Sequence, residues 1–371
     1  MGRTTFSNQD QKEKRLISHF SLTALFTIQF LANLAPTLIL IYIPLIAQGL
    51  GAQPAKIGLV VSTYHTMVFV AGILFGRLSD LRGRKRYIVL GLGISSIAFF
   101  AHLLIKNLTT LFAVRALAGF AVGIFPAALL TYAYEKNNTL GKFSAIGSLG
   151  WGVGSIVAGI VAVYYKLFIL AGVIFFITFI LAIFSLKKTP VSIKQEFFDF
   201  SVIKRNWRVY LTFLMRHAGA FGIWAIFPIY LAQLGANKFW IGVIYAINAF
   251  GQFLFLPYLD RYKSTRLITA GLIFSAITFV IFSICQNHWQ ILPFQVLLAL
   301  SWSCLYLGTL KYLMEHNEER ATAVGAFNSL MSLSGIIGPL IGGVVGSLGY
   351  RPVMLSAAFL TLASLFVFKG K

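Results

Sequence analysis

The sequence predicts an all-α membrane protein in which twelve transmembrane helices form two parallel, pseudo-symmetric halves of six helices each. Three observations predict this fold: the composition, the spacing of the apolar stretches and an internal repeat. Of the 371 residues, 58% are hydrophobic and 11% are charged, whereas soluble domains contain about 25% charged residues. A single soluble core cannot bury this much apolar surface, so lipid is the expected solvent.

The net charge of +21 raises the question of a nucleic-acid partner, but the placement of the charges argues against one. Nucleic-acid-binding domains gather basic residues on one face or along one helix. Here the basic residues form short clusters between apolar stretches, so we expect no nucleic-acid partner. The two cysteines, Cys285 and Cys304, provide neither a disulfide framework nor the spacing of a metal site.

Each transmembrane helix needs about 20 mostly apolar residues, and twelve stretches meet this requirement. We expect helices near residues 18–47, 56–77, 87–105, 109–134, 142–164, 168–186, 208–233, 239–258, 267–285, 290–313, 322–347 and 351–368. The one longer connection mixes charged residues with phenylalanines, which predicts an interfacial cytoplasmic linker. The expected domains are therefore a six-helix bundle over 1–186, the linker over 187–207 and a second bundle over 208–371.

The basic residues are distributed unequally between the two sides of the membrane. With the N-terminus inside, 24 of the 31 Lys and Arg residues lie in cytoplasmic segments, and two, Arg115 and Arg216, fall within spans. Cytoplasmic loops carry an excess of Lys and Arg, so we expect both termini in the cytoplasm. We expect these clusters to contact the anionic cytoplasmic leaflet of the plasma membrane.

The two halves of the chain are related by an internal repeat. Residues 43–52, IPLIAQGLGA, match residues 227–236, FPIYLAQLGA, at an offset of 184. The same offset carries Gly58 onto Gly242, and residues 154–159, GSIVAG, onto residues 338–343, GPLIGG. Two halves in the same orientation imply a pseudo-two-fold axis along the membrane normal. Substrate is then expected near the midplane, between halves that rock to give alternating access.

The loop between the second and third spans, residues 76–86, reads GRLSDLRGRKR. Gly76 is expected to let its helix approach a neighbour closely. Asp80 supplies an anion that can accept from an arginine, and Gly83 permits a turn. The segment resembles the signature of the major facilitator superfamily, G-x-L-x-D-R-x-G-R-[KR], with Leu81 in place of the usual Arg.

This resemblance implies a twelve-helix transporter in which the loop latches the two halves on the cytoplasmic side when the protein is open to the outside. The residues of this loop that the resemblance assigns to the latch are Gly76, Asp80, Gly83 and Arg84. Glu135, at the cytoplasmic end of the fourth span, is the expected partner of Arg84. Asp260 is the second-half counterpart of Asp80.

Two further segments resemble motifs of the same superfamily. Residues 111–123, LFAVRALAGFAVG, resemble the fourth-span motif of its proton-coupled members, with Arg115 and Gly119 in place. Residues 147–159, GSLGWGVGSIVAG, resemble the fifth-span motif of the drug antiporters. Trp151 stands where those carry Pro, and a Gly-Trp pair also occurs in sugar and nucleoside symporters. The expected helix-packing residues are Gly150, Gly154, Gly338, Pro339 and Gly342.

Polar side chains within the spans are the candidates for a substrate cavity. A charged residue in lipid costs about 2.5–3.5 kcal/mol, so an intramembrane ion indicates a functional site. Arg216 and His217 lie about nine residues into the seventh span, about 14 Å deep at about 1.5 Å per residue. The candidate cavity residues are Arg216, His217, Arg115, His65, Tyr64, Gln29, Asn33, Trp224 and Asn248. For Arg115 and His65, a packing role is the alternative.

The absence of acidic residues from the expected spans is the most informative feature of the charge distribution. All ten are expected at the cytoplasmic edge and none within a span, so a carboxylate proton relay in the cavity has no candidate. If a proton is coupled, His217 or His65 must carry it, because imidazole titrates near neutral pH, or else the substrate must. The intramembrane arginines lack a fixed buried counter-ion, which favours an anionic or strongly hydrogen-bonding substrate.

These features predict a monomeric secondary transporter that moves a small organic solute by rocker-switch alternating access, with H⁺ as the expected coupling ion. No G-x-x-x-x-G-K-[ST] loop occurs, and we expect no enzymatic activity, metal site or cofactor. A symporter for an organic anion, sugar or nucleoside suits the arginines and Trp151. An antiporter that exports amphipathic compounds suits an aromatic-rich cavity and is the alternative. A membrane sensor that does not transport a solute is a third hypothesis.

Overall fold

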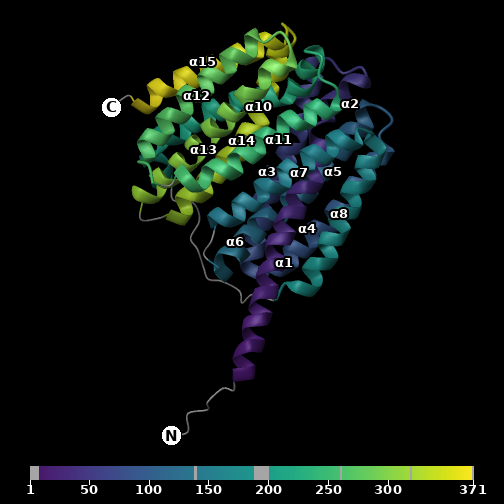
Figure 1. Cartoon of the computed structure of the whole chain (residues 1–371), viewed down its shortest axis with the longest axis vertical. Helices are drawn as coiled ribbons and strands as arrows, with labels where there is room; N and C mark the ends of the chain where they lie inside the picture. The colour runs from purple at the N-terminus through teal and green to yellow at the C-terminus, as the bar shows by residue number, and fades with distance from the viewer. Residues whose placement is uncertain (1–7, 138–139, 188–199, 260, 318–319, 370–371) are drawn as a thin grey trace.

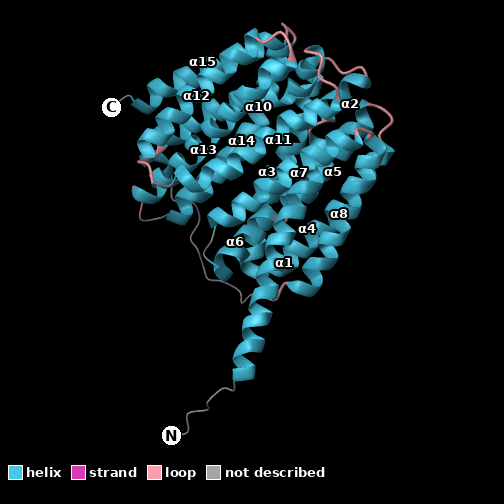
Figure 2. Cartoon of the chain, viewed as in Figure 1, coloured by secondary structure: helices cyan, strands magenta, loops and turns pink. Residues whose placement is uncertain are grey.

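The computed structural model describes residues 8–137, 140–187, 200–259, 261–317 and 320–369. Within these ranges the regular secondary structure is entirely helical (Figure 2). Twelve helical segments are long and apolar enough to cross a membrane. Large apolar side chains such as Ile97, Phe184 and Phe366 are exposed, as expected where a helix bundle faces lipid instead of water. The expected fold class is thereby confirmed.

The helices follow the predicted order of spans closely. The elements of the first half are α1 (Asn8–Leu40), α2 (Ile43–Gly49), α3 (Pro54–Arg82), α4 (Arg84–Phe100), η1 (Ala101–Leu104), α5 (Leu108–Gly123), α6 (Pro126–Asn137), α7 (Leu140–Val161) and α8 (Tyr164–Ser185). The elements of the second half are α9 (Phe200–Arg205), α10 (Trp207–Gln233), α11 (Lys238–Leu259), α12 (Ser264–Ile284), η2 (His288–Gln290), α13 (Ile291–Glu315), α14 (Arg320–Gly346) and α15 (Tyr350–Lys369).

Two spans are each divided into two α-helices, whereas the sequence predicted continuous helices over 18–47 and 109–134. The first span breaks at residues 41–42 and the fourth at residues 124–125. A proline lies in the first turn of the following helix in both cases, Pro44 in α2 and Pro126 in α6. Proline suits the first turn of a helix, where its missing backbone N–H needs no partner, so both prolines favour the start of a new helix at these positions.

The connection between the two halves differs from the simple linker expected over 187–207. It contains the short helix α9, and α10 already begins at Trp207. Residues 188–199, which include most of the expected linker, lie outside the described residues. The division of the chain into 1–186, 187–207 and 208–371 stays a prediction.

Because the described residues form an even number of spans, the start of α1 and the end of α15 lie at the same end of the bundle. We call this the terminal end. The opposite end, which holds α2 and the α7–α8 and α10–α11 connections, is the far end. The first half, purple to teal in Figure 1, lies beside the second half, green to yellow. The two halves meet mainly where α3 packs along α14 and α7 packs along α11.

Glycines make both of these contacts close. A Cβ atom on Gly58 of α3 would lie 3.0 Å from the Cα of Gly343 on α14. A Cβ on Gly242 of α11 would lie 2.9 Å from the Cα of Gly159 on α7. The offset of 184 carries Gly58 onto Gly242 and Gly159 onto Gly343. The two contacts are therefore equivalent under the repeat, which is the arrangement that a pseudo-two-fold axis produces.

The expected helix-packing residues lie at backbone contacts of the same kind. A Cβ on Gly154 would lie 2.7 Å from the carbonyl oxygen of Leu34 in α1, and its repeat partner Gly338 faces the carbonyl of Ala218 in α10. The other contacts are Gly150 with the carbonyl of Phe30, Gly342 with the carbonyl of Gly222, and the carbonyl of Pro339 with Gly58. Small residues allow helix backbones to approach closely in membrane bundles.

The buried apolar residues form two clusters that divide the molecule unevenly. The larger cluster runs through the first half and continues into the far-end parts of α10, α11, α12, α13 and α15. The smaller cluster, which includes Phe213, Leu313 and Phe327, lies toward the terminal end of the second half. The two halves thus share one core at the far end, whereas the second half has a core of its own at the terminal end.

Candidate functional site

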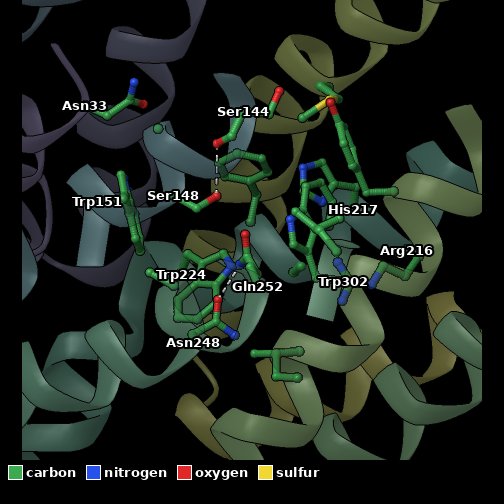
Figure 3. A pocket seen from close by; sticks show the side chains of 18 of the residues that line it. Asn33, Ser144, Ser148, Trp151, Arg216, His217, Trp224, Asn248, Gln252 and Trp302 are labelled. Atoms are coloured by element: carbon green, nitrogen blue, oxygen red, sulfur yellow. Dashed lines mark hydrogen bonds between the residues drawn. The ribbon is translucent and has the colours of Figure 1, made fainter. Parts of the chain in front are cut away.

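A cavity of about 460 Å³ lies between the two halves and is lined by side chains from both of them (Figure 3). It is lined by α1 and α7 of the first half and by α10, α11, α13 and α14 of the second. The lining residues are Gln29, Asn33, Ser144, Gly147, Ser148, Trp151, Arg216, His217, Ala220, Phe221, Trp224, Asn248, Ala249, Gln252, Leu256, Leu298, Trp302, Tyr306 and Met331. Its size and its mixture of aromatic and polar side chains are typical of a small-molecule site.

The structure brings six of the nine candidate cavity residues together here. Those six are Gln29, Asn33, Arg216, His217, Trp224 and Asn248. The other three, Tyr64, His65 and Arg115, are not among the lining residues. Tyr64 and His65 lie on α3 and Arg115 lies on α5, neither of which contributes to the wall of the cavity.

Arg216 is held by hydroxyl groups instead of by a carboxylate. Its Nε donates to the Oγ of Ser275 at 2.8 Å and its Nη2 donates to the Oγ of Ser301 at 3.2 Å. The two serine hydroxyls are 2.6 Å apart, and Ser275 Oγ also donates to the carbonyl of Gly271. Because only 2% of Arg216 is exposed, these bonds replace much of the hydration that the guanidinium loses in a buried position.

His217 belongs to an aromatic wall of the cavity. Its ring is stacked on Trp302, with ring centres 4.8 Å apart and an interplanar angle of 15°. Phe221 meets the same imidazole edge-on at 4.8 Å. Arg216 lies next to this wall and also lines the cavity, with its Cζ 5.8 Å from the centre of the Trp302 ring. Adjacent residues on a helix cannot point in the same direction, which explains why the guanidinium reaches toward α12 and α13 while the imidazole packs on Trp302.

Amide side chains supply the other polar groups of the cavity. Gln252 donates to the Oδ1 of Asn248 at 2.7 Å, one turn away on α11. Asn33 donates to the carbonyl of Gln29 on α1 at 2.9 Å. Two buried atoms of the lining residues, Nδ2 of Asn248 and Nδ1 of His217, have no hydrogen-bond partner among the described residues.

Tyr64, His65 and Arg115 form a separate group beside the interface between the halves, in which Tyr64 and Arg115 are buried and His65 is half-buried. The Cζ of Arg115 lies 4.1 Å from the centre of the Tyr64 ring. Arg115 is 1% exposed, and its Nε and Nη1 have no hydrogen-bond partner in the described part of the chain. The His65 ring meets Phe221 of the other half edge-on at 4.9 Å. A cavity role for these three residues stays a prediction.

The latch residues give a mixed result. Arg84 and Glu135 do form an ion pair, with Nε at 2.9 Å and Nη2 at 2.8 Å from the same carboxylate oxygen. Gly83 has a φ of 89°, in the region that favours glycine. In this conformation a Cβ at Gly76 would make only an ordinary contact of 3.7 Å with Ala127, so the close helix approach expected there stays a prediction. Asp260 and the side chain of Asp80 lie outside the described residues.

Sequence reasoning missed the residues that complete the cavity wall. Ser275, Ser301 and Trp302 lie on α12 and α13 and meet Arg216 and His217 only after folding. A serine in an apolar span often donates to the backbone of its own helix, so its type alone carries no signal. The unpaired arginine was the available signal, because a buried guanidinium requires acceptors from neighbouring helices.

The comparisons with known proteins agree with this geometry. The chain matches the Major Facilitator Superfamily over residues 25–250 and again over residues 209–370. It is 24% identical over 367 residues to the quinolone resistance protein NorA of Staphylococcus aureus (strain MRSA252), a match that covers 91% of this chain and 93% of NorA. It is 26% identical over 366 residues to the multidrug resistance protein MdtG of Salmonella arizonae, covering 90% of each chain.

Solved structures show the same fold at low sequence identity. The nucleoside transporter NupG superposes with a TM-score of 0.79 at 16% identity, covering 95% of this chain and all (100%) of NupG. A bacterial homologue of the human lysosomal transporter Spinster, in an inward-facing and occupied conformation, also gives 0.79 at 16% identity, covering 94% of this chain and 95% of the homologue. The chain therefore belongs to the Major Facilitator Superfamily and is a multi-pass membrane transporter of small solutes, not an enzyme.

Proposed function

We propose that the chain is a secondary active transporter that moves a small anionic or polar organic solute by rocker-switch alternating access. The observation that carries this proposal is the central cavity between two halves whose close contacts are equivalent under the repeat. Gly58 meets Gly343 on one side of the interface, and Gly242 meets Gly159 on the other. Two equivalent contacts allow the halves to rock about the cavity while each half keeps its own packing.

In this proposal the terminal end faces the cytoplasm and the far end faces outward across the plasma membrane. The excess of Lys and Arg in the terminal-end loops supports this orientation. The contacts shared by the halves at the far end then close the outer side. Transport requires these contacts to separate while the terminal ends of the two halves approach each other. The mechanism needs only one chain, so we propose a monomer.

The ion pair between Arg84 and Glu135 would serve the opposite conformation. It joins the start of α4 to α6 within the first half and fixes the loop at Gly83. When the terminal ends approach, a loop already held in place can meet the second half with little further loss of conformational entropy. In this proposal Gly76, Asp80 and Asp260 complete the latch, as the superfamily signature implies.

We propose H⁺ as the coupling ion, with an imidazole as its carrier. His65 and His217 are the candidates, because all ten acidic residues are expected outside the spans. Both imidazoles contact Phe221 edge-on, with ring centres 4.9 Å away for His65 and 4.8 Å away for His217. His65 also packs against α14, where a Cβ on Gly335 would lie 2.8 Å from its Nδ1. Protonation of an imidazole in this tightly packed interface would oppose its closure.

A second candidate function is the export of amphipathic compounds by the same fold. Two observations favour it. The chain is similar to a quinolone resistance protein, NorA, and to a multidrug resistance protein, MdtG, and tryptophans line the cavity wall. An exporter and an importer differ in the direction of coupling, while their alternating-access mechanism is the same. The chemistry of the solute and the direction of movement therefore separate the two candidates.

Reconstituted vesicles with an internal pH dye test the proposal. Organic anions, sugars, nucleosides and amphipathic cations are added one at a time with an imposed pH gradient. We expect at least one anionic or polar solute to accumulate and to move protons. Failure of every class in a folded, correctly inserted protein would contradict the proposal, and movement of amphipathic cations alone would favour export. Unchanged transport by Arg216→Ala would contradict the cavity assignment.

A further inference from the structure

The second-half wall of the cavity is rich in hydrogen-bond donors that lack acceptors. Arg216 uses Nε and Nη2 on the serines, which leaves Nη1 without a partner in the described chain. Nδ2 of Asn248 is a buried donor without a partner among the described residues, and Nδ1 of His217, which donates in the tautomer that carries the proton there, is also buried and unpaired. Asn248 is 4% exposed and His217 is 7% exposed. Buried donors without acceptors destabilise a site, so a solute that brings acceptor oxygens is favoured there.

The charge of the cavity points in the same direction. Among the lining residues, Arg216 is the only one with a permanent charge, since the others are neutral amides, hydroxyls, aromatic rings, an imidazole and apolar side chains. The hydrogen bonds of Arg216 go to neutral serine hydroxyls, which do not neutralise its charge. A solute with a negative charge supplies the missing counter-ion, whereas a cationic solute would add a second positive charge.

The aromatic side chains give the cavity flat surfaces. Trp302 and His217 are stacked in one wall. Trp151 from the first half and Trp224 from the second half both pack on Tyr245, at 5.9 and 5.1 Å between ring centres. Figure 3 shows Trp151 and Trp224 on one side of the cavity and Trp302 with His217 on the other. Planar rings gain from offset-stacked and edge-on contacts with such surfaces.

We propose that the solute of this cavity is a planar aromatic carboxylate. Its carboxylate accepts from the donor set of Arg216, His217 and Asn248, and its ring lies against Trp302 and Trp224. This inference rests on the proposed transporter function and names its substrate class. It also separates this chain from an exporter of aromatic cations, because the cavity offers no carboxylate to bind a positive charge.

Three probes with one ring system and different charges test the proposal: 2-naphthoate, 2-naphthamide and 2-naphthamidine. Binding to the purified protein is measured at constant ionic strength by thermal unfolding and by calorimetry, because a ligand of the native state raises its apparent stability. We expect naphthoate to bind at least tenfold more tightly than the amide, and the amidine not to bind. Equal or tighter binding of the amidine would overturn the proposal.

Two variants assign the effect to the donor set. Arg216→Gln should reduce the preference for naphthoate over naphthamide to less than threefold. Asn248→Asp has nearly the same shape and can still accept from Gln252, but it places a carboxylate among the donors. It should weaken naphthoate at least tenfold and allow the amidine to bind. If both variants fold and keep the wild-type preference for naphthoate, the assignment of the carboxylate to this donor set is wrong. If Arg216→Gln does not fold, the result for Asn248→Asp alone decides.

The outcomes also separate this inference from the proposed function. One outcome is that naphthoate binds with the expected preference but neither it nor related acids are transported into vesicles. The cavity then binds aromatic carboxylates, but the proposal that the protein transports them fails. If vesicles transport a sugar or a cation while naphthoate does not bind, the transporter proposal stands and the aromatic carboxylate is wrong. A saturated analogue, decalin-2-carboxylate, should bind at least fivefold more weakly than naphthoate, and equal binding would contradict the role of the flat walls.

Discussion

The two ends of the bundle are held together in different ways. At the far end, hydrogen bonds cross from one half to the other: Tyr42 Oη donates to the carbonyl of Lys238 at 2.7 Å, and Lys238 Nζ donates to the carbonyl of Ala162 at 2.9 Å. At the terminal end, an ion pair and several side-chain hydrogen bonds join helices of the same half. In the first half, Arg84 forms an ion pair with Glu135. In the second half, Ser264 donates to Glu315 and Asn206 donates to Asn317.

This difference assigns separate roles to the two sets of contacts. Bonds within a half keep the half rigid when it moves, whereas bonds between halves must break during each transport cycle. Lys238 takes part in all of these far-end contacts between the halves. Its ammonium also lies 3.9 Å from the centre of the Tyr164 ring. Its acceptor, Ala162, has a φ of 52°, a conformation that non-glycine residues rarely adopt. The backbone there is shaped to present its carbonyl across the interface.

The largest expected effect comes from enlarging a glycine where the two halves touch. Gly58→Leu would drive a side chain into the carbonyl of Pro339, and overpacking of this kind costs about 1–3 kcal/mol or more. We expect the population with a closed far end to fall at least tenfold. Spin-label distances between Lys166 and Gln286, two exposed far-end positions in different halves, measure this population in lipid nanodiscs.

Two variants control that experiment. Gly242→Leu stands at the equivalent position under the repeat and should open the far end to a similar degree. Gly72→Ala lies in the same helix as Gly58, but its Cβ would make only an ordinary contact of 3.9 Å with the carbonyl oxygen of Gly123, so its far-end distance should equal that of the wild type. A closed far end in Gly58→Leu would show that the described interface is not a required contact.

Lys238→Met should have the next largest effect. It keeps most of the apolar stem but removes both the hydrogen bond to Ala162 and the contact with Tyr164. Because Lys238 is only partly buried, we expect a loss of about 1–2 kcal/mol, which is about a five- to thirtyfold shift toward the open far end. The same pair of labels measures it, and Lys56→Met, another far-end lysine, is the matched control. An equal shift in both variants would refute a specific role for Lys238.

Tyr42→Phe removes only the hydroxyl that bonds to the carbonyl of Lys238. The ring keeps its place beside Tyr164, 5.9 Å away between centres. One neutral hydrogen bond contributes about 0.5–1.5 kcal/mol, so we expect about a two- to tenfold shift in the same direction as Lys238→Met. The combined variant should open less than the sum of the two, since both act on one connection, and full additivity would contradict a shared network.

Glu135→Gln should have the smallest effect on the far end. The ion pair with Arg84 is partly exposed and lies within the first half, so it contributes at most about 1 kcal/mol. We expect an unchanged far-end distance and a fall of a few degrees or less in the thermal unfolding midpoint. A far-end opening comparable to that of Lys238→Met would mean that the two ends are not held independently.

The sequence determined the coarse architecture because apolar length, glycine spacing and the placement of lysine and arginine are local properties. They predicted the spans, the equivalence of Gly58 and Gly242, and the pairing of Arg84 with Glu135. The breaks at Pro44 and Pro126 escaped prediction, because the apolar stretch continues through them. Ser275, Ser301 and Trp302 were not predicted, because their role depends on which helices pack against Arg216 and His217. The sequence of a single span does not contain this information.

The central claim is that the two halves move as rigid bodies about the cavity, so that one end closes when the other opens. Distances at both ends test it together, with a second label pair at Lys187 and Lys263, exposed terminal-end positions in different halves. In Gly58→Leu we expect the far-end distance to lengthen and the terminal-end distance to shorten relative to wild type in the same nanodiscs. A far-end distance that lengthens while the terminal-end distance stays the same or lengthens would contradict alternating access by rigid halves.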